Sequence, residues 1–440
     1  ANLIVVGSGI GTNTGSGFNL YTDQPGRQPP ISVKQVEASG FGEYGLFMWG
    51  WREDDQLAGF SGLTVSDSVF HHNELAGAST WAHQPLAITD VWVTDSVFHS
   101  NPGRPSYSNP SGNGIVLGHV DRGLIEHSVA YNNGASNTNS AGPVGIWAYN
   151  ANEIVIQHNI AHSNRSQGGD GGGFDLDGGT THSVMQYNFS YNNDGAGFLI
   201  AQYRGAPSFG NNVVRYNISQ NDGRRSGYGG ITVWAAQSTN RVRDTEIYHN
   251  TVYMTPAAHG TPAAVRLFGN NFSNINFRNN LLIANGDGGV DVLRADVASA
   301  LTNVRFQGNA YHHINRSSPS LKYGANTYTD LETWRAASGQ ETHDGEPTGL
   351  SIDPALCGGF RLAYPQHPAQ LTALMAYRLS PESPLRDQGE DLARHWGIER
   401  GSVDFFGRAS LSLGSEDVGA HEFQAGDCPP GAIFFESFEG

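Results

Sequence analysis

Lysine is almost missing from this chain of 440 residues, and so is any long apolar run. Only Lys34 and Lys322 occur, and the formal net charge is −16. Phosphate binding needs a basic surface, so the composition argues against a nucleic-acid partner. A membrane-spanning helix needs about 20 consecutive apolar residues, and no run approaches that length. We therefore expect neither a nucleic-acid partner nor a membrane span.

Cysteine and zinc motifs are also scarce. Cys357 and Cys428 are the only cysteines. They form one disulfide if the protein is exported, or stay two buried thiols, and the sequence leaves both interpretations open. No HExxH motif and no paired Cys/His spacing predicts zinc. The chain begins at Ala1 with no signal peptide, and we interpret it as the mature form of a secreted protein.

Glycine is abundant, with 57 residues, whereas only 15% of the residues are charged, which favours a turn-rich β protein. A sequence motif, here called the phrase, recurs along the chain: a few alternating apolar residues, then a polar pair, then asparagine. Its copies end at Asn73, Asn101, Asn133, Asn164, Asn193, Asp222 and Asn285. Neighbouring ends lie 28 to 32 residues apart, and a further copy at residues 245–255 divides the one gap of 63.

A repeat of this length without helical periodicity predicts a solenoid. Neither leucine-rich repeats nor WD40 blades fit the pattern, so we predict an all-β fold, a single-stranded parallel β-helix of about ten coils. One asparagine per coil would stack into a ladder of amide hydrogen bonds. Residues 1–40 would start or cap the solenoid, residues 41–316 form its coils, and residues 317–440 supply the last coils, a short helix near 329–339 and a capping tail.

A second strand recurs between these phrases, and each copy begins with glycine or alanine. Because side chains alternate along a strand, aligning the copies separates inward from outward residues. The inward set is Ile115, Ile146, Phe174, Phe198, Ile231, Val265 and Val290. The outward set is Val116, Trp147, Asp175, Leu199, Thr232, Arg266 and Asp291, followed two residues later by Tyr149, Asp177, Ala201, Trp234 and Phe268.

Three acids stand out in the segment GGDGGGFDLDGG, residues 168–179. Asp175 and Asp177 would share one face of a strand, about 6.6 Å apart at Cα. That spacing suits the acid and base of an inverting glycosidase, and two close acids would separate their pKa values. A structural Ca²⁺ site or a hydrogen-bonded turn is the plainer interpretation. We predict that Asp175, Asp177 and Asp170 are catalytic.

Aromatic residues flank these acids on the predicted outward face. Trp147 and Tyr149 lie on one side, and Trp234 and Phe268 lie on the other. Sugar rings stack their C–H faces on aromatic rings, so the surface suits a polysaccharide or oligosaccharide. The predicted substrate-binding residues are Trp147, Tyr149, Trp234, Phe268, Tyr203 and Arg204.

The repeated coils, the asparagine-rich turns and the acidic corner followed by MQYNFSYNNDGAGFL resemble secreted right-handed parallel β-helix proteins of the pectate-lyase-like superfamily. The segments YRLSPESPLRDQG, DFFG and DVGAHE near the end are similar to the closing part of many such proteins. The resemblance covers roughly residues 40 to 424 and implies a polysaccharide lyase, a glycoside hydrolase or a uronate epimerase. The NTD and GHG motifs of polygalacturonases do not occur.

Two further sites depend partly on this resemblance. Asp170 and Asp194 could bind Ca²⁺, as in pectate-lyase relatives, although each also suits an ordinary turn. Arg266 could hold a substrate carboxylate or act as a lyase base, as an arginine does in some relatives. An ion pair between Arg266 and Asp291 is the equally weighted structural alternative.

We favour a glycoside hydrolase that uses Asp175 and Asp177 and needs no cofactor. The first alternative is a Ca²⁺-dependent polysaccharide lyase with an arginine base, and the second is a non-catalytic glycan-binding β-helix or adhesin. The expected partner is a glycan, and we expect a monomer.

Overall fold

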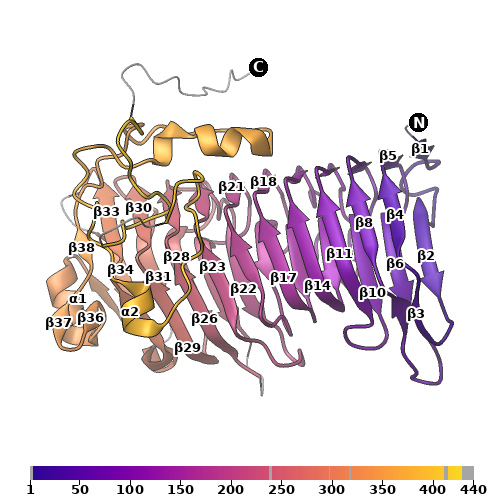
Figure 1. Ribbon diagram of the computed structural model, residues 1–440, viewed down its shortest axis with the longest axis horizontal. Coiled ribbons are helices and arrows are strands. Elements are labelled where there is room, and N and C mark those ends of the chain that lie inside the picture. The colour runs from indigo at the N-terminus through magenta and orange to yellow at the C-terminus, as the bar shows by residue number, and fades with distance from the viewer. Residues whose placement is uncertain (1–2, 237–239, 297, 317–318, 411–414, 429–440) are drawn as a thin grey trace.

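The computed structural model describes residues 3–236, 240–296, 298–316, 319–410 and 415–428. Within them the chain forms a parallel β-helix, in which three long sheets wind around one core and successive coils run from β1 and β2 at one end to α1 at the other (Figure 1). The predicted fold class is confirmed. The final residues of the predicted capping tail, 429–440, lie outside the described part of the chain.

Each sheet collects one strand from every coil. The first sheet contains β1 (Leu3–Val6), β5 (Val36–Ser39), β9 (Val69–His71), β12 (Val97–His99), β15 (Val129–Tyr131), β18 (Ile160–His162), β21 (Phe189–Tyr191), β24 (Ile218–Gln220), β27 (Thr251–Met254), β30 (Leu281–Asn285), β33 (Ala310–Ile314) and β38 (Leu350–Ser351). The second contains β2 (Phe18–Thr22), β6 (Tyr44–Gly50), β10 (Ala76–Ala82), β13 (Asn113–Gly118), β16 (Val144–Tyr149), β19 (Gly172–Leu176), β22 (Phe198–Gln202), β25 (Gly229–Ala235), β28 (Ala263–Gly269), β31 (Asp291–Ala295), β34 (Leu321–Tyr323) and β35 (Asn326–Tyr328). The third contains β4 (Ile31–Lys34), β8 (Leu63–Ser66), β11 (Ile88–Thr94), β14 (Val120–Glu126), β17 (Asn152–Gln157), β20 (Val184–Gln186), β23 (Asn212–Arg215), β26 (Val242–Tyr248), β29 (Phe272–Arg278) and β32 (Val304–Gln307).

The remaining elements are short. Two small pairs of strands are β3 (Gly26–Gln28) with β7 (Ala58–Phe60) and β36 (Thr342–His343) with β37 (Glu346–Pro347). The helices are α1 (Leu331–Ser338), α2 (Leu392–Trp396) and the 3-10 turns Ala298–Asn303, Pro368–Ala373 and Met375–Tyr377. None of the helices in the described residues has the length and apolarity needed to cross a membrane.

The core of the solenoid follows from strand alternation. In β19, Phe174 and Leu176 are fully buried in the interior, whereas Asp175 between them points outward. Coil after coil repeats this pattern, so like side chains stack, as Phe174 does on Phe198 with ring centroids 5.2 Å apart. The apolar interior holds the strands in register and so fixes which side chains reach the outer surface.

Two ladders of buried amides stabilise the turns. In the predicted ladder, Asn101 donates from Nδ2 to Oδ1 of Asn133 at 2.9 Å, and the chain of bonds continues to Asp222. A second ladder begins at Asn159, runs through five further asparagines and ends at Glu341. Sequence reasoning did not single out this second ladder, although the repeat carries asparagine at this position from Asn159 onward, after serine in the earlier copies.

Helix α1 and the strands around it close the far end of the solenoid. Residues 352–410 and 415–428, called the covering segment here, pack against one side of the first sheet. Helix α1 begins after Asp330, which caps it, and its Trp334 is fully buried against the last coils. Cys357 and Cys428 form a disulfide, which resolves the alternative that the sequence left open. The disulfide ties together two parts of this covering segment that are 71 residues apart.

Candidate active site

The second sheet places the predicted outward residues on one surface. Val116 pairs with Trp147, Trp147 with Asp175, and Asp175 with Leu199 in adjacent strands. The same row continues through Thr232 to Arg266. The alignment of these six coils is therefore confirmed.

The alignment of the following coil was wrong. Arg266 pairs with Arg294, and Asp291 pairs with Ala263 at the beginning of the strand. The register therefore slips by three residues, because β31 starts directly at Asp291 and Leu293, in place of Val290, pairs with Val265. Val290 is buried in the core as predicted, but it lies before the paired residues. Asp291 consequently does not continue the outward row.

A cleft of about 860 Å³ is hollowed over the middle of this surface. The three acids Asp170, Asp175 and Asp177 all line it. Its aromatic lining consists of Tyr44, Phe47, Trp81, Tyr107, Trp147, Tyr149, Tyr203, Tyr228, Trp234 and Phe268. No Lys, Arg, His or Glu belongs to this lining within the described part of the chain. The cleft is thus aromatic, with three carboxyl groups and no cationic side chain in the part of its lining that the structure describes.

Asp175 lies at the base of the cleft, held by the middle of β19. Its residue surface is only 3% exposed, and its Oδ1 has no hydrogen-bond partner among the described residues. Burial raises the pKa of this carboxyl group well above its usual value, and the nearby Asp177 and Asp170 raise it further. Asp175 therefore favours the protonated form, which can donate a proton.

Asp177 directly follows β19. Its backbone N–H donates to the carbonyl of Ala148 at 2.9 Å, which extends the register by one residue. Its Oδ1 accepts a hydrogen bond from the backbone N–H of Gly178 at 2.7 Å. Burial raises the pKa of Asp177 to about 7, with that hydrogen bond opposing the shift and Asp170 adding to it. Asp177 therefore changes its charge near neutral pH.

Asp170 reaches the cleft from the turn before β19, where its backbone takes a left-handed conformation with φ of 53°. Its Oδ1 accepts from the hydroxyl of Tyr228 at 2.8 Å, and its Oδ2 accepts from the N–H of Gly142 at 3.1 Å. Burial raises the pKa of Asp170 to about 6, although both hydrogen bonds lower it. Glycine is required at Gly195, because a Cβ there would lie 2.7 Å from the backbone of Asp170.

The aromatic side chains are held by specific contacts. Trp147 donates from Nε1 to Oδ1 of Asn113 at 3.0 Å, and its ring lies 5.3 Å from that of Tyr149. Tyr203 donates to Oδ1 of Asn150 at 3.2 Å. Gly118 makes room for one of these rings, since a Cβ there would lie 2.6 Å from the ring of Tyr149. The rings are consequently oriented before any ligand binds.

Five of the six predicted substrate-binding residues line the cleft, and Arg204 does not. Arg204 is exposed in the turn after β22. Arg266, predicted as catalytic, also lies outside the cleft lining. Its guanidinium forms an ion pair with Asp296 and lies over the ring of Phe268 at 5.5 Å. Burial lowers the pKa of Arg266, while Asp296 raises it.

The ion pair predicted between Arg266 and Asp291 is wrong, because Arg266 pairs with Asp296. Asp291 instead binds Lys322, with Nζ and Oδ2 2.9 Å apart, and accepts from the hydroxyl of Ser320 at 2.8 Å. The three-residue slip of β31 explains the difference, because it moves Asp291 away from the position beside Arg266.

Asp194, predicted with Asp170 to bind Ca²⁺, does not line the cleft. Its carboxylate pairs with Nη1 of Arg165 at 3.2 Å and accepts from the N–H of Ser166 at 3.1 Å. A Ca²⁺ site at Asp170 and Asp194 stays a prediction, and these contacts give Asp194 a structural role in joining two coils.

Sequence reasoning missed Tyr228, the hydrogen-bond partner of Asp170, and Tyr107 in the wall of the cleft. Tyr107 belongs to the long turn 102–112 before β13, whereas the equivalent turn before β10 is only 74–75. The neighbouring turn 134–143 supplies Ser140 and Ala141 to the lining. Unequal turn lengths between otherwise regular repeats could therefore have located the wall of the cleft.

Comparison with known proteins supports the fold. The family model described as "Right handed beta helix region" matches residues 56–214, which include the cleft acids. No curated protein matches the sequence. Among solved structures, the chain is similar to the native GH136 lacto-N-biosidase from Eubacterium ramulus, with 15% identity and a TM-score of 0.41 over 58% of this chain and 44% of that one.

Two further solved structures are similar to this chain at a comparable level. Pectate lyase Pel9A has 15% identity and a TM-score of 0.45, covering 96% of this chain and 97% of that one. The A-module of the Azotobacter vinelandii mannuronan C-5 epimerase AlgE6 has 14% identity and a TM-score of 0.34, covering 70% and 88%. The chain is a right-handed parallel β-helix, and these distant likenesses concern the fold alone.

Proposed function

We propose that this protein is a glycoside hydrolase that cleaves a neutral glycan in the cleft. The observation that carries the proposal is the set of three carboxyl groups in an aromatic cleft whose lining contains no cation. Aromatic rings bind the C–H faces of sugars, and the acids lie between those rings. The Cys357–Cys428 disulfide fits an oxidising compartment, where secreted glycan-degrading enzymes act.

Asp175 is the general acid in this proposal. Burial and the neighbouring acids raise the pKa of its carboxyl group well above the usual value, which favours the protonated form, and one of its oxygens has no partner within the described residues. It donates that proton to the glycosidic oxygen as the bond from this oxygen to the anomeric carbon breaks. The departing sugar thereby leaves as a neutral alcohol.

Asp177 is the general base. It takes a proton from a water molecule whose oxygen bonds to the anomeric carbon, so Asp177 ends protonated and Asp175 ends ionised. Exchange with solvent restores both groups. The proposed reaction is therefore a single displacement, with inversion at the anomeric carbon.

Asp170 serves as a fixed negative charge. The hydrogen bonds from Tyr228 and Gly142 hold its carboxylate in place and favour its ionised form. A carboxylate at this position raises the pKa of Asp175 and stabilises positive charge that develops on the sugar ring in the transition state.

The cleft is less suited to a uronate polymer. A lyase needs positive charge beside the substrate carboxylate, and the lining within the described residues contains no Lys, Arg or His side chain to supply it. Arg266, the predicted lyase base, is engaged with Asp296. Electrostatic repulsion from the ionised Asp170 and Asp177 would further weaken the binding of a polyanion.

The test is incubation with a panel of neutral and uronate polysaccharides, with and without a chelator. We expect new reducing ends from a neutral glycan, no absorbance from unsaturated uronate, and no effect of the chelator. D175N and D177N should each lose cleavage, while D67N, at an exposed turn, retains it. Unsaturated products would establish a lyase, and binding without cleavage of any polymer would leave a glycan-binding module.

A further inference from the structure

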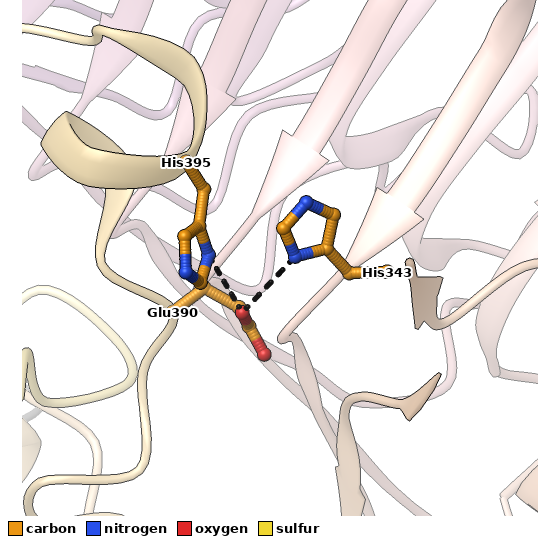
Figure 2. A group of neighbouring side chains, drawn as sticks. All are labelled: His343, Glu390 and His395. Carbon is orange, nitrogen blue, oxygen red and sulfur yellow. Dashed lines mark ion pairs between the residues drawn. The ribbon is translucent and has the colours of Figure 1, made fainter. Parts of the chain in front are cut away.

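A second group of ionisable side chains lies beyond the last coils. The group consists of His343 on β36, Glu390 just before α2, and His395 on α2. Their ligand atoms lie within 4.8 Å of one another. Nδ1 of His395 lies 3.2 Å from Oε2 of Glu390, and Nδ1 of His343 lies 3.9 Å from the same oxygen. Figure 2 shows the two imidazole rings on either side of the carboxylate. None of the three lines the cleft.

Glu390 is fixed by the coil beneath it. Its backbone N–H donates to Oδ1 of Asn279 at 2.9 Å, and its carbonyl accepts from Nδ2 of the same side chain at 2.9 Å. Its side chain passes over Gly308, where a Cβ would lie 2.7 Å from Cγ of Glu390. The carboxylate is therefore positioned by the solenoid as well as by its own loop.

The two histidines are also restrained. The residue before His343, Thr342, accepts at its carbonyl from Nε2 of Gln307 at 3.1 Å, which ties β36 to β32. The ring of Trp396 packs 4.6 Å from the ring of His343, and the guanidinium of Arg278 lies 4.3 Å from the ring centre of Trp396. The three side chains are 20–27% exposed, so an ion can reach them from solvent.

We propose that His343, Glu390 and His395 form a binding site for a first-row divalent cation, with Zn²⁺ the preferred ion. Two imidazole nitrogens and one carboxylate oxygen match the ligands that Zn²⁺ takes in proteins, with water completing a tetrahedron. Ca²⁺ and Mg²⁺ prefer sites built from oxygen alone. Asp344, 3.9 Å from Nε2 of His343, can orient that ring from the outer side.

The site joins segments that are far apart in the sequence. His343 belongs to the strand pair after the last coil, whereas Glu390 and His395 come from the covering segment that returns along the solenoid. An ion bound here would cross-link these segments in the folded state only, and would therefore stabilise that state by mass action. The sequence hides the site because 47 residues separate His343 from Glu390.

The experiment uses the full chain without an added histidine tag, stripped of metal, and titrates it with ZnCl₂ by calorimetry. We expect one ion per chain, and a rise in Tm of roughly 3–5 °C at 100-fold excess of free zinc over Kd. E390Q and H395Q should each raise Kd by roughly 100-fold or more and abolish the rise in Tm. H182Q is the matched control, because His182 hydrogen-bonds to Asn152 and Asn211, lies outside the His343, Glu390 and His395 group, and should leave zinc binding unchanged.

Co²⁺ supplies a second readout that does not depend on stability. We expect visible absorption bands from Co²⁺ bound to the unmodified chain and to H182Q, and none from E390Q or H395Q, with folding checked by circular dichroism. CaCl₂ should not displace Co²⁺ from the chain. Absence of one-to-one binding to the unmodified chain, or unchanged binding by E390Q and H395Q, would overturn the proposal and leave an ion-paired cluster.

Discussion

Two regions of this molecule hold buried carboxyl groups in contrasting surroundings. In the covering segment, Glu416 accepts hydrogen bonds from His249, Arg400, Asn279 and the backbone N–H of Leu392. Burial raises the pKa of Glu416, but these donors outweigh it and the pKa is lowered. In the cleft, Asp175 faces two other acids and has an oxygen without a partner among the described residues.

The comparison separates an acid that stabilises the fold from acids that are held ready to react. A buried charge is tolerated when donors surround it, and removing one partner then destabilises the protein. The cleft acids have fewer such partners: Asp175 has an oxygen without a partner within the described residues, and burial raises the pKa of all three acids at a cost in stability. A raised pKa alone does not identify a catalytic acid. Burial raises the pKa of Glu422 to about 9, yet Glu422 does not line the cleft.

The largest expected effect comes from the two acids assigned to catalysis. On the natural glycan, D175N and D177N should each lower kcat by roughly 10²–10⁴-fold. On an aryl glycoside with an activated leaving group, D175N should recover most of its rate, because that group departs without a proton, whereas D177N should not. Steady-state kinetics on both substrates measures the difference. Equal losses on both substrates for D175N would contradict its role as the acid.

The second largest effect is a loss of stability expected at Glu416, the buried acid that is surrounded by donors. E416Q should destabilise the protein by about 3–5 kcal/mol, because His249 and Arg400 would lose the charge that pairs with them. E422Q in the same segment is the matched control and should cost less than about 1 kcal/mol, since Glu422 is already protonated. Denaturant unfolding compares the two variants. A larger loss in E422Q would show that the comparison assigns the charges wrongly.

Stability should depend on pH in opposite directions for the two regions. The lowered pKa of Glu416 gives stability that is present above about pH 4.5 and lost as the pH falls through its folded value. The raised pKa of Asp177 lowers stability as the pH rises from its usual value of 3.8 to about 7. Unfolding free energies measured across this range should decline less steeply at higher pH in D177N. An identical decline in D177N and the unmodified chain would exclude Asp177 as its source.

Removing one aromatic wall should have a moderate effect on binding. W234A should raise KM roughly ten-fold, about 1.4 kcal/mol, with a smaller change in kcat, because stacking on Trp234 is made before and during the reaction. W92A is the control: Trp92 is 43% exposed on β11 of the third sheet, away from the cleft lining. Unchanged KM in W234A would place the sugar elsewhere.

The smallest effect is predicted for Arg266. R266Q should change kcat/KM on a neutral glycan by less than roughly three-fold, because its guanidinium is paired with Asp296 outside the cleft lining. R294Q, on the adjacent strand of the same sheet, is the comparison. Loss of activity in R266Q alone would restore the arginine base of the lyase alternative.

The sequence predicted the solenoid because its period and its strand alternation are local properties. Phe174 inward and Asp175 outward follow from alternation alone, and the Gly-led corners aligned six coils correctly. The slip at β31 shows the limit of this reasoning. Gly289 and Val290 resemble a strand start, but pairing with Ala263 begins at Asp291, and only the three-dimensional register decides this.

The candidate site was predictable where it depends on the strands and less so where it depends on turns. Asp175, Trp147 and Tyr149 follow from the repeat. Tyr228 is 58 residues from Asp170, and no sequence pattern indicates that its hydroxyl returns to that carboxylate. Arg266 looked available from the sequence because its partner, Asp296, lies outside the aligned positions.

The central claim is that Asp175 carries a proton in the resting protein at neutral pH. Infrared difference spectroscopy of the unmodified chain against D175N tests it directly, because a protonated carboxyl group has a carbonyl band that a carboxylate lacks. We predict that this band is present in the unmodified chain at neutral pH and absent in D175N. A spectrum in which D175N loses only carboxylate bands would show that Asp175 is ionised and would contradict its assignment as the general acid.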